Sequence, residues 1–494
     1  LTSETVADEP TAWERARDLA GTPFDVATGP LVRWTLLAWP NATDDTTEHL
    51  LVVVAHHLIT DGWSSDLLVG EVVAVHRALT ADSEPALPRL TVGYRDFAQW
   101  QRARLAGDRL EEHLAFWRER LDGVPALDLP TDRPRPRRQQ FAGATVETTI
   151  DESTRVALAR LGAERGATLH MVLRTAWTWL LAAWSGQERF AVATPVAGRV
   201  SPDVEGLVGM FVNTLAIPAL VAPDQPFGDA VSEVRDSVLD ALAHQELPFE
   251  LLVADLRIER DVSRSPVAQT LFAVQNFALR DHAASAQADA SRSGLSAWWQ
   301  PVDTGGTRFD LECQVVEVAG GLRSTFTYST ALFEESTIVE LAGHWSRALA
   351  RLAALPGTLP GELGIPLAAR VAPSAAPGPE DAPPDDDAAV ESEQLVATVW
   401  SEVLGVRPGP HDDFFRLGGH SLLATQVSVR VAALLDVEVP VAVLFEEPTL
   451  HAYARAVEEL VLAEIDALSD EEARELLAAD TPTVSDPAEE PVNR

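Results

Sequence analysis

Residues 50–62 have the sequence LLVVVAHHLITDG, which joins a strand signal to a pair of histidines. The apolar run before the histidines predicts a short strand that is buried on both faces of a sheet. His56 and His57 follow where this strand would end, and Asp61-Gly62 predicts a turn soon after them. Reactive side chains of α/β proteins gather at strand ends, so the two histidines are the first candidate site.

Three interpretations of the histidine pair compete. A metal site is not favoured, because neighbouring side chains on an extended strand point to opposite faces and metal-binding pairs more often lie at helical offsets. In the plain structural interpretation, both rings are satisfied core groups. In the third, one ring exchanges protons near neutral pH while its neighbour anchors the strand. Spacing alone does not decide between the structural and the acid–base interpretations.

Helices and strands are expected in mixed order on both sides of this segment. Aromatic and leucine residues at helical spacing predict a helix over residues 94–121, and a proline-rich crossing segment follows it. The apolar run from Met171 to Trp184 predicts a buried helix that is too short to cross a membrane. The mixture indicates an α/β layered architecture. The other expected elements are a helix from about Ser153, strands over 190–194 and 211–217, and a helix over 227–243.

Length and charge exclude several classes of protein. A chain of 494 residues is too long for one hydrophobic core, so at least two domains are expected. Its net charge of −37 opposes binding to nucleic acid or to an anionic membrane surface, and neither is expected as a partner. The single cysteine, Cys313, excludes a disulfide framework and favours the cytoplasm.

Composition changes sharply near the C-terminus. Residues 368–390 are rich in proline, alanine and acidic residues, which predicts a solvated linker. A segment of helical periodicity follows, and residues 467–494 form an acidic tail.

Ser421 belongs to a second candidate site. The sequence Asp413–Ala424, DFFRLGGHSLLA, ends a loop and opens a helix. A serine there is a favoured helix cap, which is the structural interpretation. A nucleophile elbow needs G-x-S-x-G and fails, because Leu423 occupies the second glycine position. As a modification site, an exposed serine at the positive end of a helix suits an attached phosphate.

Residues His56–Gly62 resemble the HHxxxDG motif of condensation domains in nonribosomal peptide synthetases. The resemblance extends over about residues 10–360 and includes further family motifs in the family's order. These are Tyr94–Trp100 (YRDFAQW), Leu129–Pro136 (LPTDRPRP), Val208–Leu215 (VGMFVNTL), His244–Glu250 (HQELPFE) and Arg260–Pro266 (RDVSRSP).

The resemblance implies a fold and a set of site residues. The fold would be two-lobed, like chloramphenicol acetyltransferase, with a tunnel in which two carrier-borne thioesters meet. His57 would be the catalytic residue, with His56 supporting it. Asp61 would pair with Arg199, and Gly62 would leave room for the substrate.

Asn213 would either line the tunnel or make a structural hydrogen bond. Two features depart from the family's pattern. Pro218 stands where the family usually has an arginine, which puts that local contact in doubt. The family also has a much longer segment before the histidine motif than the 55 residues present here, so the N-terminal lobe is expected to be incomplete.

Asp413–Ala424 is similar to the carrier-protein motif DxFFxLGGHSLL, so the resemblance implies that Ser421 carries 4'-phosphopantetheine. The expected carrier is a small four-helix bundle with helices near residues 391–404, 421–435, 441–445 and 449–464. The expected domains are a partial N-lobe over 1–150, a C-lobe over 151–367, the linker over 368–390, the carrier over 391–466 and the tail over 467–494.

Together the resemblances predict an enzyme that forms amide (peptide) bonds in nonribosomal peptide biosynthesis. The donor acyl group would arrive as a thioester on an upstream carrier protein, and the acceptor amine would be held on the arm of Ser421. Further expected partners are a phosphopantetheinyl transferase and an adenylation domain, acting in trans or outside this chain. The alternatives are acyl transfer to a free amine or alcohol, and a non-catalytic fragment that docks carriers. No metal is expected.

Overall fold

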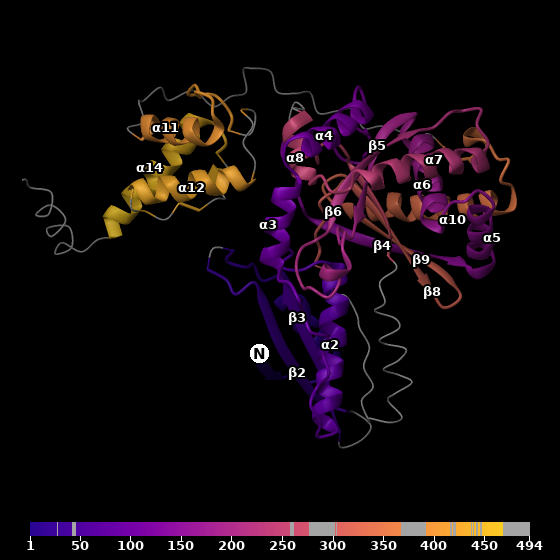
Figure 1. Cartoon of the computed structure of the whole chain (residues 1–494), viewed down its shortest axis with the longest axis horizontal. Helices are drawn as coiled ribbons and strands as arrows, with labels where there is room; N and C mark the ends of the chain where they lie inside the picture. The colour runs from indigo at the N-terminus through magenta and orange to yellow at the C-terminus, as the bar shows by residue number, and fades with distance from the viewer. Residues whose placement is uncertain are drawn as a thin grey trace, which may run out of the picture. The chain divides into compact units, whose positions relative to one another are not determined.

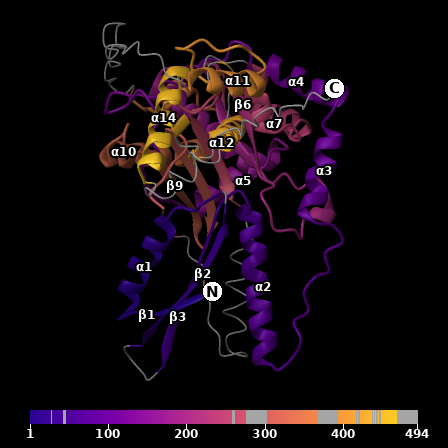
Figure 2. The same ribbon diagram turned by 90° about the vertical axis from the view of Figure 1, so that its left-hand side faces the viewer.

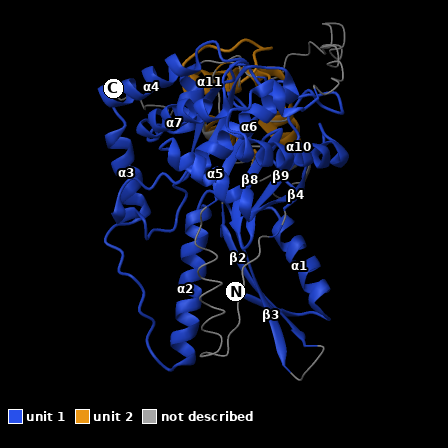
Figure 3. Ribbon diagram, turned by 90° about the vertical axis from the view of Figure 1, so that its right-hand side faces the viewer, with its two compact units in different colours: residues 1–376 blue, residues 377–494 orange. Residues whose placement is uncertain are grey.

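The chain forms two compact units, residues 1–376 and residues 377–494 (Figure 3). The structure, a computed structural model, describes residues 1–26, 28–41, 46–256, 261–275, 302, 304–366, 392–414, 417, 421–435, 437, 439–440, 443–444 and 447–467. The predicted linker over 368–390 lies outside the described residues. So does the predicted tail, except for its first residue.

Unit 1 begins with a three-stranded sheet in the order β1-β2-β3. Strands β1 and β2 are parallel, β2 and β3 are antiparallel, and helix α1 packs against β2 and β3 (Figure 2). Helix α2 follows residues 56–61, which contain His56 and His57 and are called the histidine turn below. The bounds are β1 Thr2–Thr5, α1 Glu9–Gly21, β2 Val32–Pro40, β3 Thr47–Ala55 and α2 Gly62–Thr80.

Strand β3 occupies the predicted position, but its predicted burial on both faces is wrong. Only Val52 is fully buried, whereas Leu51 is exposed. Within the described residues the small core of this sheet has four buried members, with Val52 beside Leu37 and two alanines of α1. One face of β3 therefore packs against the core. The opposite face is more exposed than the apolar run in the sequence indicated.

The single helix predicted over residues 94–121 is wrong, because the structure has two helices there. They are α3, Tyr94–Arg104, and α4, Asp108–Leu121. Gly107 between them has a φ of +57°, which side-chain-bearing residues rarely adopt and which ends the helical path. The hydrophobic spacing continues across the break, so periodicity alone did not reveal it.

The crossing segment after α4 is fixed by ionic and capping contacts. Asp132 accepts hydrogen bonds from the backbone N–H of Glu334 at 2.8 Å and from the hydroxyl of Thr337 at 2.9 Å, at the start of helix α10. Arg135 forms an ion pair of 2.5 Å with Asp310, whose side chain is 2% exposed. These contacts bind the segment to the start of α10 and to the residue that precedes β8.

The second sheet of unit 1 has six strands in the order β4-β9-β8-β7-β5-β6. Neighbouring strands are antiparallel, except that β7 is parallel to both β5 and β8. Strand β6 is an edge, which tolerates Pro218 because an edge residue can lack a backbone donor. The strands are β4 Gly143–Asp151, β5 Arg189–Val196, β6 Asn213–Leu220, β7 Thr270–Gln275, β8 Leu311–Val318 and β9 Gly321–Ser329.

Helices α5, α6, α7 and α10 pack against one another and against this sheet (Figure 1). Helix α6 contains the predicted buried run, begins at the capping residue Thr168 and ends at Gly186, whose φ is +74°. Their large shared core contains four tryptophans from α6 and α10. The bounds are α5 Glu152–Glu164, α6 Leu169–Ser185, α7 Phe227–Ala243, α8 Phe249–Leu256, α10 Glu335–Ala354 and two short 3-10 turns, Pro202–Val204 and Pro360–Leu363.

Unit 2 is a small helical body with its own core. Its described helices are α11 Glu393–Leu404, α12 Ser421–Leu435 and α14 Leu450–Ala467. Trp400 of α11 packs edge-on to Phe414 at 4.9 Å between ring centroids and also contacts Tyr453 of α14. Of the helix predicted over 441–445, only residues 443 and 444 are described, and they are helical.

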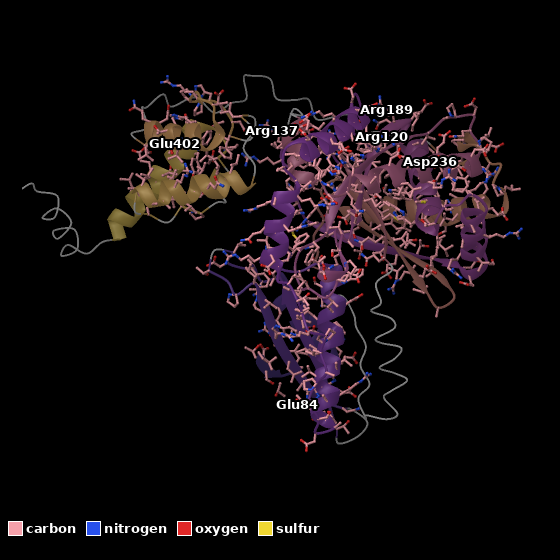
Figure 4. The ribbon with its side chains drawn as sticks, in the orientation of Figure 1. Glu84, Arg120, Arg137, Arg189, Asp236 and Glu402 are labelled. Atoms are coloured by element: carbon pink, nitrogen blue, oxygen red, sulfur yellow. The ribbon has the colours of Figure 1, made fainter. Side chains whose placement is uncertain are left out.

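Charged side chains extend from the outer faces of both units (Figure 4). Glu84 follows α2, and Glu402 on α11 pairs with Arg430 of α12 at 3.1 Å.

Candidate functional site

The histidine pair lies directly after β3, at the strand end that the sequence predicted. The backbone N–H of His56 donates to the carbonyl of Leu31 at 2.8 Å, and its ring meets Phe24 edge-on at 5.9 Å between centroids. The Nδ1 atom of His56 accepts the backbone N–H of Leu58 at 3.1 Å. His56 is thus half-buried and engaged by its surroundings.

His57 differs from its neighbour, because its side chain is exposed and makes no hydrogen bond with any described residue. A ring in that condition can offer either nitrogen to a ligand. Within the described residues, no group of three or more histidine, cysteine or acidic side chains could hold a metal ion.

Asp61 is the N-cap of α2 and a buried junction at the same time. Its Oδ1 accepts the N–H of Ser64 at 2.8 Å, as a capping residue does. Its Oδ2 accepts the backbone N–H of Phe211 at 2.9 Å, and Arg199 Nη2 lies 3.2 Å from Oδ1. The side chains of Asp61 and Arg199 are 3% and 2% exposed.

Arg199 ties this carboxylate to the loop before β6. Its Nη1 donates to the carbonyls of Val204 at 2.6 Å and Leu207 at 2.8 Å. Its guanidinium carbon lies 4.0 Å from the centre of the Phe211 ring. Burial lowers the pKa of Arg199, and the charge of Asp61 offsets part of that effect.

Gly198, beside Arg199, is required by its backbone. Its φ is +65°, and a Cβ there would lie 1.9 Å from the carbonyl oxygen of Phe211. The backbone at residue 198 can therefore approach the backbone of Phe211, just before β6, only if residue 198 has no side chain. Gly62, by contrast, is the exposed first residue of α2.

Three further residues, whose contacts sequence analysis did not foresee, join α2 and α3 to the loop over 205–211. The hydroxyl of Ser64 donates to the carbonyl of Gly209 at 2.9 Å and accepts its N–H at 3.0 Å. Trp63 donates to the carbonyl of Glu205 at 2.9 Å, and the Tyr94 hydroxyl donates to the carbonyl of Met210 at 2.7 Å. Ser64 and Trp63 directly follow Gly62, and Tyr94 opens the motif Tyr94–Trp100, but no spacing rule links them to residues more than a hundred positions away.

Asn213 makes structural hydrogen bonds with every polar atom of its amide. Its Nδ2 donates to the carbonyls of Gln245 at 2.9 Å and Leu247 at 2.7 Å. Its Oδ1 accepts the N–H groups of Thr214 and Phe249, the latter opening α8. These bonds match the structural interpretation of Asn213.

Ser421 is the first residue of α12 in unit 2. The first N–H groups of a helix have no partner within the helix, and a 15-residue helix presents a positive end. A phosphodiester attached at this position would meet that end, so the backbone fits a phosphopantetheine arm. Residues 418–420 of the motif lie outside the described residues.

Comparisons with known proteins identify the families to which the two units are similar. The family model "Condensation domain" matches residues 2–369, which is most of the chain. The chain belongs to the condensation domain family. A second model, "Phosphopantetheine attachment site", matches residues 394–457, which include Ser421. The predicted family and the predicted cofactor class are thereby confirmed.

Curated relatives of this condensation domain chain are peptide synthetases. It is 39% identical over 340 residues to a linear gramicidin synthase of Brevibacillus parabrevis, a match that covers 69% of this chain and 6% of that protein. It is 37% identical over 339 residues to phosphinothricin tripeptide synthetase PhsC of Streptomyces viridochromogenes, covering 68% of this chain and 30% of that one. The chain thus spans a small part of each relative's length.

Solved structures confirm the fold class of the condensation domain. The X-domain from teicoplanin biosynthesis superposes with a TM-score of 0.64 at 23% identity, covering 74% of this chain and 81% of that one. The first condensation domain of the calcium-dependent antibiotic synthetase gives a TM-score of 0.56 at 20% identity, covering 73% and 77%. Among the described residues, no helix is both long enough and apolar enough to cross a bilayer.

Proposed function

We propose that this chain forms an amide bond between a donor acyl thioester on another carrier and an acceptor amine held on its own carrier domain at Ser421. The observation that carries the proposal is the contrast between the two histidines. His56 is fixed by Leu31, Phe24 and Leu58, whereas the exposed ring of His57 has no partner among the described residues.

The bond-forming step needs little chemistry from the protein. The lone pair of the acceptor amine attacks the thioester carbonyl, a C–N bond forms, and the C–S bond breaks. The amine loses one proton and the departing sulfur gains one, so no other reactant is needed. A ring nitrogen of His57 receives the first proton or orients the amine that carries it.

Asp61 and Arg199 serve this step indirectly. Their buried ion pair fixes the start of α2 to the loop before β6. The turn that carries His57 lies between β3 and this junction, so its backbone is held at both ends. In this proposal His56, Asp61, Gly62 and Arg199 support the site without touching substrate, and the hydrogen bonds of Asn213 give it the same kind of role.

The carrier function is assigned to Ser421 rather than to a thiol of the chain. When bound there, phosphopantetheine supplies the thiol that holds the acceptor. Cys313, the one cysteine, is fully buried, and burial raises the pKa of its thiol well above the ordinary value. A buried neutral thiol cannot exchange acyl groups with a partner.

The proposed partners follow from this division. A phosphopantetheinyl transferase attaches the arm, an upstream carrier protein delivers the donor, and an adenylation domain outside this chain activates the acceptor amino acid. The cytoplasm is the proposed location, since it keeps Cys313 reduced.

The test loads Ser421 with an aminoacyl pantetheine and adds a donor-loaded carrier. Dipeptidyl product is followed by mass spectrometry for the parent chain, His57→Ala and the control His76→Ala. His76 is an exposed histidine further along α2. Product that disappears with His57→Ala and persists with His76→Ala supports the proposal.

A docking role is the second candidate. The solved complex of the teicoplanin X-domain with OxyB shows, for that protein, a similar fold bound to another protein (TM-score 0.63). Equal product from the parent chain and His57→Ala would refute the role of His57. Binding of the donor carrier without any product would favour docking, and product formed only with free amines or alcohols would favour acyl transfer to soluble acceptors.

A further inference from the structure

The residues that follow α1 lie against the histidine pair. Residues 22–26 come directly after α1, and the ring of Phe24 meets the ring of His56 at 5.9 Å with an interplanar angle of 86°. Leu31, just before β2, accepts the backbone N–H of His56 at 2.8 Å. Two points of the connection between α1 and β2 therefore touch the same histidine.

Arg33 holds Phe24 in this position. Arg33 lies on β2 opposite Val54, one residue from the end of β3. Its Nη2 donates to the carbonyls of Thr22 at 2.5 Å and Pro23 at 3.3 Å. Its guanidinium carbon lies 3.9 Å from the centre of the Phe24 ring, within the range of a cation–π contact.

Arg33 has no ion-pair partner among the described residues, and its buried Nε has no hydrogen-bond partner there. Because its contacts are with two carbonyl groups and one aromatic ring, Arg33 holds the backbone of residues 22–24 and the ring of Phe24 in place. It makes no other polar contact that would explain its place on β2 within the described chain.

His56 transmits this order to the turn. Its Nδ1 accepts the N–H of Leu58 at 3.1 Å, so the proton of the neutral ring is on Nε2. Its carbonyl accepts the N–H of Ile59 at 3.1 Å. His57 lies between these two bonds, and because its ring makes no hydrogen bond with a described residue, the backbone of the turn sets where the ring is.

We propose that Arg33 and Phe24 are positioning residues for His57, acting through the ring of His56. The inference rests on the proposed function of His57. A rotated His56 ring would release the N–H of Leu58, and the exposed ring of His57 would then sample positions away from the reacting amine. Displacements of about 1 Å can cost on the order of a hundredfold in rate.

The test compares Phe24→Ala and Arg33→Met with the control Arg15→Met. Arg15 lies on α1 in the same lobe and pairs with Glu4 at 2.8 Å, away from the turn. Arg33→Lys is added because lysine keeps the charge but lacks the planar fork that reaches two carbonyls. Each loaded full-length chain is assayed in a single turnover: kcat is the rate constant at saturating donor carrier, and KM is the donor-carrier concentration that gives half of that rate.

A second readout is amide hydrogen exchange at Leu58 and Ile59, which does not depend on activity. Phe24→Ala and Arg33→Met should lower kcat about tenfold or more, leave KM within about twofold, and speed exchange at both amides about tenfold. For Arg33→Lys, kcat and the two exchange rates should lie between those of Arg33→Met and the parent chain. Arg15→Met should have the kcat and exchange rates of the parent chain.

Unchanged kcat in both variants would overturn the proposal, as would a rise in KM at constant kcat. Faster exchange together with the kcat of the parent chain would also overturn it. Phe24 and Arg33 would then hold the turn, but loosening the turn would not affect catalysis by His57. If His57→Ala itself retains full activity, the proposed function fails, and exchange at Leu58 and Ile59 separately decides whether Phe24 and Arg33 hold the turn.

Discussion

Replacing Arg199 with methionine should make unit 1 unfold more readily, because the change leaves the buried carboxylate of Asp61 without its counter-ion. Methionine keeps an unbranched apolar side chain at this position but removes every donor. The bonds lost are those to Asp61, to Ser64 and to the carbonyls of Val204 and Leu207.

The size of the loss follows from burial. With side-chain exposures of 2% and 3%, neither charge of the Arg199–Asp61 pair can be rehydrated without opening the structure. Removing one partner of such a pair costs about 3–5 kcal/mol, and each stranded carbonyl adds about 1 kcal/mol or more. We therefore expect the free energy of unfolding to fall by about 5–7 kcal/mol.

Urea unfolding followed by tryptophan fluorescence measures this change. Twelve of the 13 tryptophans precede residue 377, and Trp400 is the exception, so the signal reports mainly on unit 1. Arg160→Met is the matched control, since Arg160 pairs with Glu164 on the surface of α5 at exposures of 80% and 55%. It should cost at most about 0.5 kcal/mol.

A loss below about 1 kcal/mol for Arg199→Met would refute this account of the junction. The double variant Asp61→Asn/Arg199→Met gives a second check. Its loss should be smaller than the sum of the single losses, because the neutral amide that replaces the Asp61 carboxylate leaves no stranded charge. Strict additivity would mean that Asp61 and Arg199 do not interact energetically.

Three further outcomes are expected. Arg174→Met should raise the melting temperature of unit 1. Arg174 is fully buried, two of its nitrogens lack partners among the described residues, and burial lowers its pKa to about 10, so an apolar side chain of similar length removes a costly buried charge. A lower melting temperature would contradict this. Burial lowers the pKa of His113, and it lowers the pKa of His170 from 6.5 to about 4. Below pH 6.5 the unfolded chain therefore binds more protons than the folded chain, so the free energy of unfolding should fall as the pH drops from 7 to 4, for His170 by about 3 kcal/mol. Melting temperatures that stay constant over this pH range would contradict the prediction. Gly198→Ala should destabilise unit 1 strongly in urea, whereas Gly107→Ala, with a similar φ but open space around it, should cost much less, and equal losses would disprove the close approach at Gly198.

The sequence predicted the elements whose signals are local. The helix over 227–243 has the predicted bounds, and the helix at Ser421 begins where the motif places it. The histidines follow a strand, as the apolar run before them indicated. Such features depend on periodicity and end signals within one segment, which a single sequence contains.

Contacts between distant segments were not predictable from spacing. The pairing of Asp61 with Arg199 was expected only from family resemblance, and the bonds of Ser64 to Gly209 were not expected at all. The contact of Phe24 with His56 joins positions 32 apart across a strand pair. No periodic pattern records which loop a capped helix will meet, because that depends on the packing of both lobes.

The dual task of Asp61 sets an order of events during synthesis. Its carboxylate caps a helix that begins at residue 62, yet the backbone group it also binds belongs to Phe211, 150 positions later. On the ribosome, the histidine turn must wait for that later segment to emerge before it can be locked. A nascent chain stalled between these points would carry every candidate catalytic group of the first lobe and still lack the geometry that makes them useful.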